Sequence, residues 1–250
     1  MDLGLRDRVA LVTGASKGIG RGIAGTLIAE GARVAIASSS ADRIAATAGE
    51  LGARGYVHDS GDLDAVPALV AQVQADLGPV DIYVANTGGP PSGDDPLGFT
   101  REQWEAAHRT LVLSPMTFLE HLLPAMAERG FGRVVAIGSI AVREPPDHLQ
   151  LSNSHRPGLV TAFKVLARRY AGAGVTLNHV HPGAIATDRI YDTSGGREAA
   201  ERSARERIPA GRLGTVDELA AAAVFLCSVP AGYITGTSLL VDGGASRSVS

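Results

Sequence analysis

The segment "TGASKGIG" at residues 13–20 has the glycine spacing of a loop that binds phosphate groups. Gly14 would permit a tight turn, and Gly18 and Gly20 would let the backbone and the next helix approach a pyrophosphate closely. An apolar run precedes this loop, and a helical pattern follows it. Because a strand, a glycine loop and a helix in this order form a dinucleotide site, the segment favours such a site over a plain strand-to-helix turn.

The end of the next apolar run, "IASSSADR", bears on which nicotinamide dinucleotide would bind. Ser38, Ser39 and Ser40 offer hydroxyls and no carboxylate, while Lys17 and Arg43 can supply positive charge. An acidic side chain at this place binds the ribose 2′-hydroxyl of NAD, whereas basic groups suit the 2′-phosphate of NADP. The segment therefore predicts NADPH rather than NADH. The alternative is that the serines form only a polar loop and a helix cap.

Short apolar runs alternate with amphipathic segments along the chain. The runs rich in valine and isoleucine predict strands at 8–14, 33–38, 81–86, 132–139, 174–182 and 238–244. The segments between them predict helices at 18–31, 42–52, 62–77, 101–130, 158–172 and 216–227. This alternation predicts an α/β fold, a Rossmann-type doubly wound parallel sheet with helices on both faces, in a single domain over 1–250. Ligands of such sheets bind beyond the carboxyl ends of the strands.

The polar segment 187–214 interrupts this pattern, and it is rich in glycine and arginine. Long insertions in compact domains are often functional, so we expect a substrate lid of helical pieces near 188–212 rather than a plain surface excursion. Its arginines are expected to form a solvated helix face rather than to grip an anion. They are Arg189, Arg197, Arg202, Arg205 and Arg207.

Composition excludes several classes of protein. The 250 residues carry a net charge of −3 and no long basic run, which argues against nucleic acid or an anionic membrane as a partner. The single cysteine, Cys227, excludes an intrachain disulfide and a cysteine-based zinc site, and we expect no metal. No signal peptide or spanning apolar run is evident, so a cytoplasmic location is expected.

Five motifs, in order along the chain, resemble those of the short-chain dehydrogenase/reductase family. They are "TGASKGIG" (13–20), "HDSGD" (58–62), "ANTGG" (85–89), "IGSI" (137–140) and "HPGAIAT" (181–187). The resemblance implies the family's fold and a nicotinamide cofactor, with adenine near Asp59, ribose near Asn86 and the carboxamide near Thr187. The cofactor-binding residues that it implies are Gly14, Ser16, Lys17, Gly18, Ile19, Gly20, Ser38, Ser39, Asp59, Ser60, Asn86, Gly88, Arg156, Pro182, Gly183, Ile185 and Thr187.

Three of the four positions of the family's proton relay differ in this chain. The family uses Asn, Ser, Tyr and Lys, and the motifs place Leu111, Ser139, Ser152 and Arg156 there. A serine hydroxyl is shorter and a far weaker acid than a phenol, and arginine stays charged, so neither simply replaces the tyrosine. Arg156 can still bind ribose or stabilise an oxyanion, and Ser139 can orient a carbonyl. The chain resembles a minor branch of the family that carries this Ser/Arg pair. This resemblance implies Ser139, Ser152 and Arg156 as the catalytic residues.

The segment "LSNSHRPGL" (151–159) also carries a structural signal. Pro157 lacks an N–H and is best placed in a first helical turn, so a helix is expected to begin near Asn153 or Ser154, either of which would cap it. Capping alone would also explain the polar residues around Ser152.

Two functions follow from a kept cofactor site and an altered relay. The first is an NADPH-dependent ketoreductase whose proton comes from water, from one of His148, His155, His179 and His181, or from a phenol or enol of the substrate. The substrate's own hydroxyl best explains the loss of three relay groups. The second is a non-catalytic NADP(H)-binding sensor or partner protein, which explains the retained Ser139 and the candidate lid less well.

Substrate and assembly are expectations from analogy. A bulky aromatic polyketide ketone suits a site without the tyrosine, as in ketoreductases that tailor angucyclinone-type antibiotics, although fatty-acyl and sugar ketones also remain open. The segment "YITGTSLLVDGG" (233–244) resembles the family's closing strand, which often packs across a subunit interface. We therefore expect a homotetramer or a homodimer.

Overall fold

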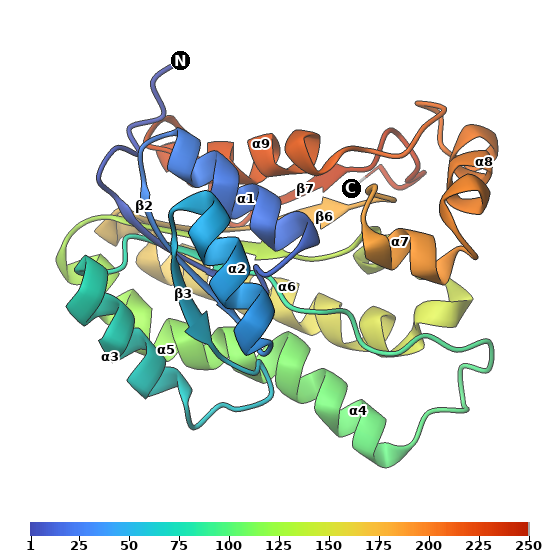
Figure 1. The fold of residues 1–250 in the computed structure, drawn as a ribbon, viewed down its shortest axis with the longest axis horizontal. Coiled ribbons are helices and arrows are strands. Elements are labelled where there is room, and N and C mark those ends of the chain that lie inside the picture. The colour runs from blue at the N-terminus through green and yellow to red at the C-terminus, as the bar shows by residue number, and fades with distance from the viewer. Residues whose placement is uncertain (250) are drawn as a thin grey trace.

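The computed structural model describes residues 1–249, which form one parallel sheet of seven strands (Figure 1). The strand order is β3-β2-β1-β4-β5-β6-β7, so the order reverses between β1 and β4. The strands are β1 Val9–Thr13, β2 Arg33–Ser38, β3 Arg54–Val57, β4 Ile82–Ala85, β5 Gly132–Ile137, β6 Val175–Pro182 and β7 Ser238–Val241. This confirms the predicted doubly wound, Rossmann-type sheet.

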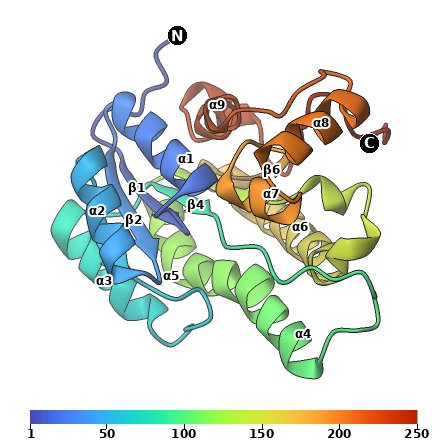
Figure 2. The same cartoon turned by 45° about the vertical axis from the view of Figure 1, so that its right-hand side comes forward.

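Helices cover both faces of the sheet, as Figure 2 shows. The central strand β1 buries all five of its residues, because a parallel strand between two helical layers is apolar on both faces. One apolar core lies between the sheet and α1, α2 and α9, and a second lies between the sheet and α3, α5 and α6. These helices are α1 Gly18–Ala29, α2 Ala41–Leu51, α9 Val216–Leu226, α3 Val66–Leu77, α5 Ser114–Glu128 and α6 Gln150–Tyr170.

Strand β3 was not among the predicted runs. It is an edge strand in which only Tyr56 is buried, so its four residues lack the apolar run that marks the central strands. Its carboxyl end places His58 and Asp59 beside the end of β2, because His58 N donates to Ser38 O at 2.9 Å. The missed strand therefore helps to position one wall of the site.

The predicted helix over 101–130 is divided by a π-helical turn. A capping box starts α4 (Arg101–His108), in which Gln103 N donates to Thr100 Oγ1 at 3.3 Å and Thr100 N donates to Gln103 Oε1 at 2.8 Å. The π turn spans Arg109–Leu113, and α5 continues from Ser114. Such turns often adjoin functional sites, and this one directs Leu111 into the core with 2% of its surface exposed.

The prediction that a helix begins near Asn153 or Ser154 is wrong, because α6 already begins at Gln150. Neither residue is the cap: Asn153 Nδ2 donates to Pro146 O at 2.7 Å, and Ser154 Oγ donates to Gln150 O at 2.9 Å. Pro157 lies in the helix interior. Burial of Leu151, Leu159 and Phe163 along one face of α6 outweighs the one backbone hydrogen bond that the proline cannot form.

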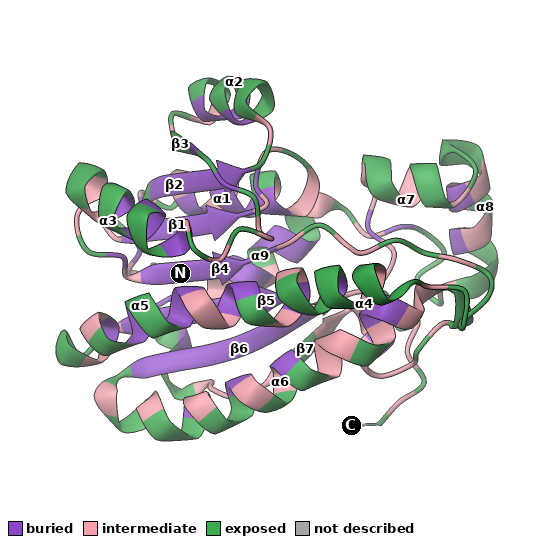
Figure 3. Cartoon of the chain, turned by 90° about the horizontal axis from the view of Figure 1, so that it is seen from below, coloured by how far each residue is buried: buried purple, intermediate pink, exposed green. Residues whose placement is uncertain are grey.

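The segment 187–214 forms two short helices that project from the sheet, α7 (Asp188–Thr193) and α8 (Arg197–Arg207). Its two ends meet at a bridge, where Ala186 N donates to Gly214 O at 2.8 Å and Gly214 N donates to Ala184 O at 3.0 Å. Both helices expose most of their surface (Figure 3). The predicted helical pieces are present, and the segment also contacts the rest of the domain through Ala210 N, which donates to Gly243 O at 3.0 Å.

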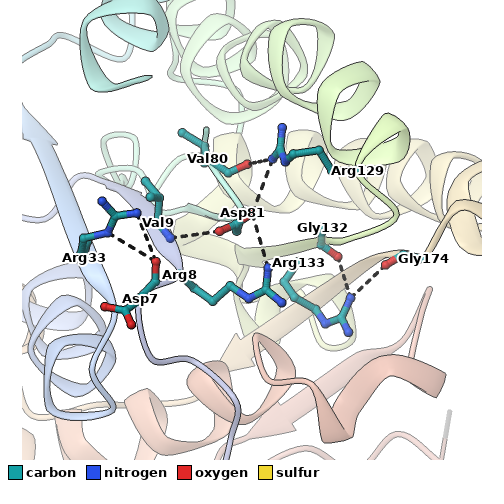
Figure 4. A network of polar contacts seen from close by, with 10 residues as sticks. All are labelled: Asp7, Arg8, Val9, Arg33, Val80, Asp81, Arg129, Gly132, Arg133 and Gly174. Atoms are coloured by element: carbon teal, nitrogen blue, oxygen red, sulfur yellow. Dashed lines mark hydrogen bonds and ion pairs between the residues drawn. The ribbon is translucent and has the colours of Figure 1, made fainter. Parts of the chain in front are cut away.

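Polar contacts of arginines and Asp81 hold the amino ends of the strands together (Figure 4). The Asp81 carboxylate lies 3.8 Å from Arg8 Nη1 and 3.6 Å from Arg129 Nη2, and it accepts from Val9 N at 3.2 Å. The buried Arg133 donates to three backbone carbonyls, including Gly174 O at 3.0 Å. All of these contacts lie between elements of the scaffold, so they indicate a structural role.

The helices of residues 1–249 also bear on the membrane. None of them combines the length and the apolar character that crossing a bilayer requires. Within the same residues, no cluster of three histidine, cysteine or acidic side chains is arranged to hold a metal ion.

Candidate active site

Two adjoining clefts open at the carboxyl ends of the strands, next to the point where the strand order reverses. The first cleft has a volume of about 740 Å³ and the second about 670 Å³. Ile19, Asn86, Thr187 and Arg189 line both, so the two are continuous. All of the residues predicted to bind cofactor or substrate line these clefts, with the exception of Gly20.

The glycine loop uses its three glycines in two different ways. Gly14 has a φ of +57°, and an added Cβ there would lie 2.5 Å from Asn86 O. A Cβ at Gly20 would lie 2.5 Å from Gly14 O, so Gly20 lets α1 pack against the loop and does not line a cleft. Gly18, with a φ of +56°, does line the first cleft. It leaves the start of α1 open to a phosphate group.

Asn86 fastens the glycine loop to the end of β4. Its Nδ2 donates to Gly14 O at 2.8 Å and to Thr13 O at 3.3 Å, while Thr13 Oγ1 donates to Asn86 O at 3.0 Å. The side-chain amide therefore orders the loop that is predicted to bind the pyrophosphate. Asn86 Oδ1 remains at the border of both clefts as an acceptor.

The serines at the end of β2 divide into cleft residues and a helix cap. Ser38 and Ser39 line the first cleft, and the buried Ser38 Oγ has no hydrogen-bond partner among residues 1–249. Ser40 caps α2 by accepting from Arg43 N at 3.4 Å. Lys17 and Arg43 also line the cleft. The lining thus offers the unpaired Ser38 hydroxyl and the two cations, and no carboxylate lines the cleft between residues 38 and 43. This combination fits the 2′-phosphate of NADP.

Lys17→Ala should weaken NADPH binding more than NADH binding. Lys17 Nζ lies 4.0 Å from the exposed Asp188 carboxylate, a separation at which it remains available to a phosphate. Loss of a charge-assisted contact would cost about 1–2 kcal/mol, or roughly a 5- to 30-fold increase in the Kd of NADPH alone. Fluorescence titration with both dinucleotides checks this, and an equal loss for both would mean that Lys17 does not contact the 2′-phosphate.

The part of the first cleft where the resemblance places adenine contains one residue of the motif "HDSGD" that was not predicted as a site residue, His58. Asp59 and Ser60 line it as predicted, and Asp59 Oδ1 accepts from Gly61 N at 2.8 Å. His58 lies beside them, almost completely buried, with its ring edge-on to Phe118 at 5.4 Å between centroids. Burial lowers the pKa of His58, so its ring is neutral at physiological pH.

The floor of the second cleft brings together Ser139, Ser152 and Arg156, as the motif spacing predicted. Arg156 Nε donates to Ser152 Oγ at 3.0 Å, and Arg156 Nη1 donates to Ile137 O at 2.9 Å. Ser139 Oγ accepts from Ala141 N at 3.1 Å, which leaves its hydroxyl proton free for a ligand. Burial, together with the charge of Arg189, lowers the pKa of Arg156 to about 10, so it stays a cation at neutral pH.

Of the four histidines considered as proton donors, only His148 lines a cleft. His155 Nδ1 lies 2.7 Å from Leu151 O, and its ring packs against Trp104 and His108. His179 and His181 are buried beneath the second cleft and line neither cavity. The buried Leu111 leaves no side chain to order a water at the family's asparagine position.

His179 and His181 form a buried, stacked pair, with ring centroids 5.6 Å apart. His181 Nδ1 and Nε2 and His179 Nε2 have no hydrogen-bond partner among residues 1–249. Burial is the main cause that lowers the pKa of His179 to about 3 and that of His181 to about 4, and the nearby positive charge of Arg156 acts in the same direction on both. Both rings are therefore neutral at physiological pH and unsuited to donate a proton as imidazolium.

Further walls of the clefts come from helices that the sequence motifs did not include. Residues of α4, of the π turn after it and four of the six residues of α7 border the first cleft, and the loop after β4 contributes to both clefts. The residues concerned are Gln103, Ala106, Ala107, Thr110, Asp188, Arg189, Asp192, Thr193, Gly89, Pro90 and Pro91. Only α7 of the expected lid reaches the clefts, whereas no residue of α8 lines them.

Comparison with known proteins agrees with this geometry. A family model described as enoyl-(acyl carrier protein) reductase matches residues 14–246. A 3-oxoacyl-[acyl-carrier-protein] reductase (FabG) from Haemophilus influenzae is 36% identical over 244 residues, covering 96% of this chain and 98% of its own.

Two solved structures extend the comparison. The L-sorbose reductase of Gluconobacter frateurii, complexed with NADPH and L-sorbose, superposes with a TM-score of 0.90 at 28% identity over the whole of both chains. YwfH, an NADPH-dependent reductase involved in bacilysin biosynthesis, has a TM-score of 0.90 at 26% identity, covering 97% of this chain and 99% of its own. The matches over almost the full length, together with the clefts at the strand ends, show that the chain belongs to the short-chain dehydrogenase/reductase family.

Proposed function

We propose that the protein is an NADPH-dependent ketoreductase that reduces a carbonyl to a hydroxyl on a bulky, aromatic polyketide-type substrate. The observation that carries the proposal is the floor of the second cleft. There Ser139, Ser152 and Arg156 offer hydrogen-bond donors, and no phenol stands among the lining residues to act as general acid. The chain is an oxidoreductase like its relatives, among which YwfH is an NADPH-dependent reductase and the L-sorbose reductase was solved in complex with NADPH.

The first cleft supplies the cofactor site. Gly18 and the start of α1 would hold the pyrophosphate, and Lys17, Ser38 and Arg43 would hold the 2′-phosphate. Thr187, which lines both clefts, and Ile185, which lines the second, follow β6 and would orient the nicotinamide. Bound NADPH would supply the hydride. Arg156 lies on the floor between these groups, and its cationic guanidinium would bind the nicotinamide ribose.

In the second cleft the chain would orient the ketone rather than protonate it. The free proton of the Ser139 hydroxyl would donate to the carbonyl oxygen, and Arg156 would stabilise negative charge that develops nearby. Ser152 accepts from Arg156 and thereby fixes the guanidinium. The proton for the new alkoxide would then come from a hydroxyl of the substrate beside the carbonyl, or from water. A cleft of about 670 Å³ accommodates a ring system of drug size.

NADPH oxidation with a panel of ketones tests the proposal. The panel should hold hydroxylated aromatic ketones, a 3-oxoacyl thioester and a ketose. Oxidation that starts only when an aromatic ketone is added supports the proposal. Faster turnover of the 3-oxoacyl thioester would move the substrate class to that of the FabG relative. Tight NADPH binding without turnover of any ketone would instead favour the sensor.

We also propose that the protein assembles as a homotetramer or a homodimer. Strand β7 is an edge of the sheet with Leu239 exposed, and α6 exposes 64% of Val165 on its outer face. Exposed apolar side chains next to an unpaired strand edge support contact with another copy. Light scattering at micromolar concentration should give a mass of two or four chains, and a 25.7 kDa monomer would contradict it.

A further inference from the structure

Arg189 differs from the other arginines of the segment 187–214. On α8, Arg197 pairs with Glu201 at 4.0 Å and Arg202 pairs with Glu198 at 3.8 Å, which confirms for these two the expectation of a solvated helix face. Arg189, at the start of α7, has no carboxylate within ion-pair distance among residues 1–249. It lines both clefts, which contradicts that expectation for this residue.

Arg189 is held across the mouth of the site by the loop after β4. Its Nη1 donates to Gly89 O at 3.2 Å and its Nη2 donates to Pro90 O at 3.1 Å. A Cβ at Gly89 would collide with the Arg189 guanidinium, so the glycine leaves the space that the side chain fills. The Nε of Arg189 forms no hydrogen bond with residues 1–249, and it remains a free donor.

A second guanidinium, that of Arg156, lies on the floor of the same second cleft. Arg156 is fixed by Ser152 Oγ and Ile137 O, and its Nη2 forms no hydrogen bond with residues 1–249. Burial lowers the pKa of Arg156, and the charge of Arg189, which lines the same cleft, acts in the same direction. Two like charges in one cavity are unfavourable unless an anion lies between them.

The lining of the second cleft supplies no such anion on its floor. Its only carboxylate among the described residues is that of Asp94, which is exposed on the loop that follows β4. The other polar side chains of the lining, which include the hydroxyls of Ser139 and Ser152 and the imidazole of His148, are not carboxylates. The floor therefore favours a ligand that brings an acidic, electron-rich oxygen of its own.

We propose that Arg189 and Arg156 together bind the acidic hydroxyl oxygen that stands beside the reacting carbonyl, as in a phenol or an enol. This rests on the proposed ketoreductase function and narrows its substrate class. As the hydride forms a C–H bond at the carbonyl carbon, the O–H bond of the neighbouring hydroxyl breaks and its proton passes to the carbonyl oxygen. The two guanidiniums stabilise the oxyanion that remains, which regains a proton from solvent after release.

Absorbance titration of a bound probe tests this without turnover. The probe is 1-hydroxyanthraquinone, whose hydroxyl lies beside a carbonyl and whose spectrum changes on ionisation, bound to the complex of the protein with NADP⁺. In the wild-type complex the ionisation constant of the probe should rise about 10- to 100-fold over that in solution. Arg189→Met should remove most of this rise, and Arg189→Lys should retain part of it. Arg202→Met, which changes an exposed arginine of α8, should leave it unchanged.

Two controls separate this proposal from the alternatives. The Kd of 1-methoxyanthraquinone and the Kd of NADP⁺ should be the same for the wild type and Arg189→Met. If Arg189→Met raises the Kd of NADP⁺ but leaves the ionisation constant of the bound probe as in the wild type, Arg189 binds the pyrophosphate and the proposal is overturned. A wild-type complex that fails to bind the probe or to shift its ionisation would overturn it as well. The ionisation constant of the probe could also shift in a way that depends on Arg189 while the protein reduces no ketone. That result would refute the proposed function and leave the anion site standing.

Discussion

Methylating the substrate hydroxyl beside the reacting carbonyl should slow turnover by about 10²–10⁴-fold, whereas binding of the ketone should survive. General acid catalysis is worth about this factor, and the methyl ether has no proton to give. The residues that line the second cleft include no tyrosine, so no phenol of the protein can replace it. Steady-state kinetics with a hydroxy ketone and its methyl ether, compared with their Kd values, measure the effect.

Ser152→Ala should cost less than about tenfold in kcat in the same assay. Ser152 is only 5% exposed, and its Oγ accepts from Arg156 Nε at 3.0 Å, so its main contact is with the guanidinium. A serine hydroxyl is also too weak an acid to act as the tyrosine does. Ser139→Ala should leave substantial activity, because only orientation of the carbonyl is lost. A harmless methylation combined with a nearly inactive Ser152→Ala would show that the serine is the acid.

Acid should destabilise the fold well above the pH at which carboxylates titrate. The pKa values of His179 and His181 are about 3 and 4 in the folded protein and about 6.5 when unfolded. Between these values the unfolded chain binds more protons, so the free energy of unfolding falls as the pH falls. The stabilisation is complete above pH 6.5, declines as the pH falls from there, and is fully lost below about pH 4 for His181 and about pH 3 for His179. The slope should be about 2.7 kcal/mol per pH unit near pH 5.

Urea titrations between pH 7 and 4.5 measure this slope. His58, whose pKa burial also lowers, acts in the same direction. The positive charges that face the pair are Arg143 and Arg156, and neither changes its charge in this range. His181→Asn should reduce the slope by about 1.4 kcal/mol per pH unit, since one proton is removed from the linkage. His121→Gln, at an exposed histidine of α5, should not change it, and an unchanged slope in both variants would mean that the pair stays protonated when folded.

The sequence by itself determined six of the seven strands of the sheet, the glycine loop and most of the site. Central strands such as β1 are buried on both faces, so their apolar runs are visible without any partner. Motif spacing was enough to place Ser139, Ser152 and Arg156 on one floor, because each follows or faces the carboxyl end of a strand. The serines of "SSSADR" could also be placed at the cofactor cleft from the sequence, because the carboxyl end of β2 borders the cleft in this kind of sheet.

Only the tertiary structure decided what depends on contacts between distant segments. Strand β3 forms because it pairs with β2, although its own residues are mostly exposed. Helix α6 begins at Gln150 in spite of Pro157, because its apolar face packs on the sheet. Arg189 belongs to the site and not to the solvated arginines of α8, because its partners Gly89 and Pro90 lie about a hundred residues away. Sequence patterns report local preference and burial, whereas these outcomes depend on which surfaces the fold brings together.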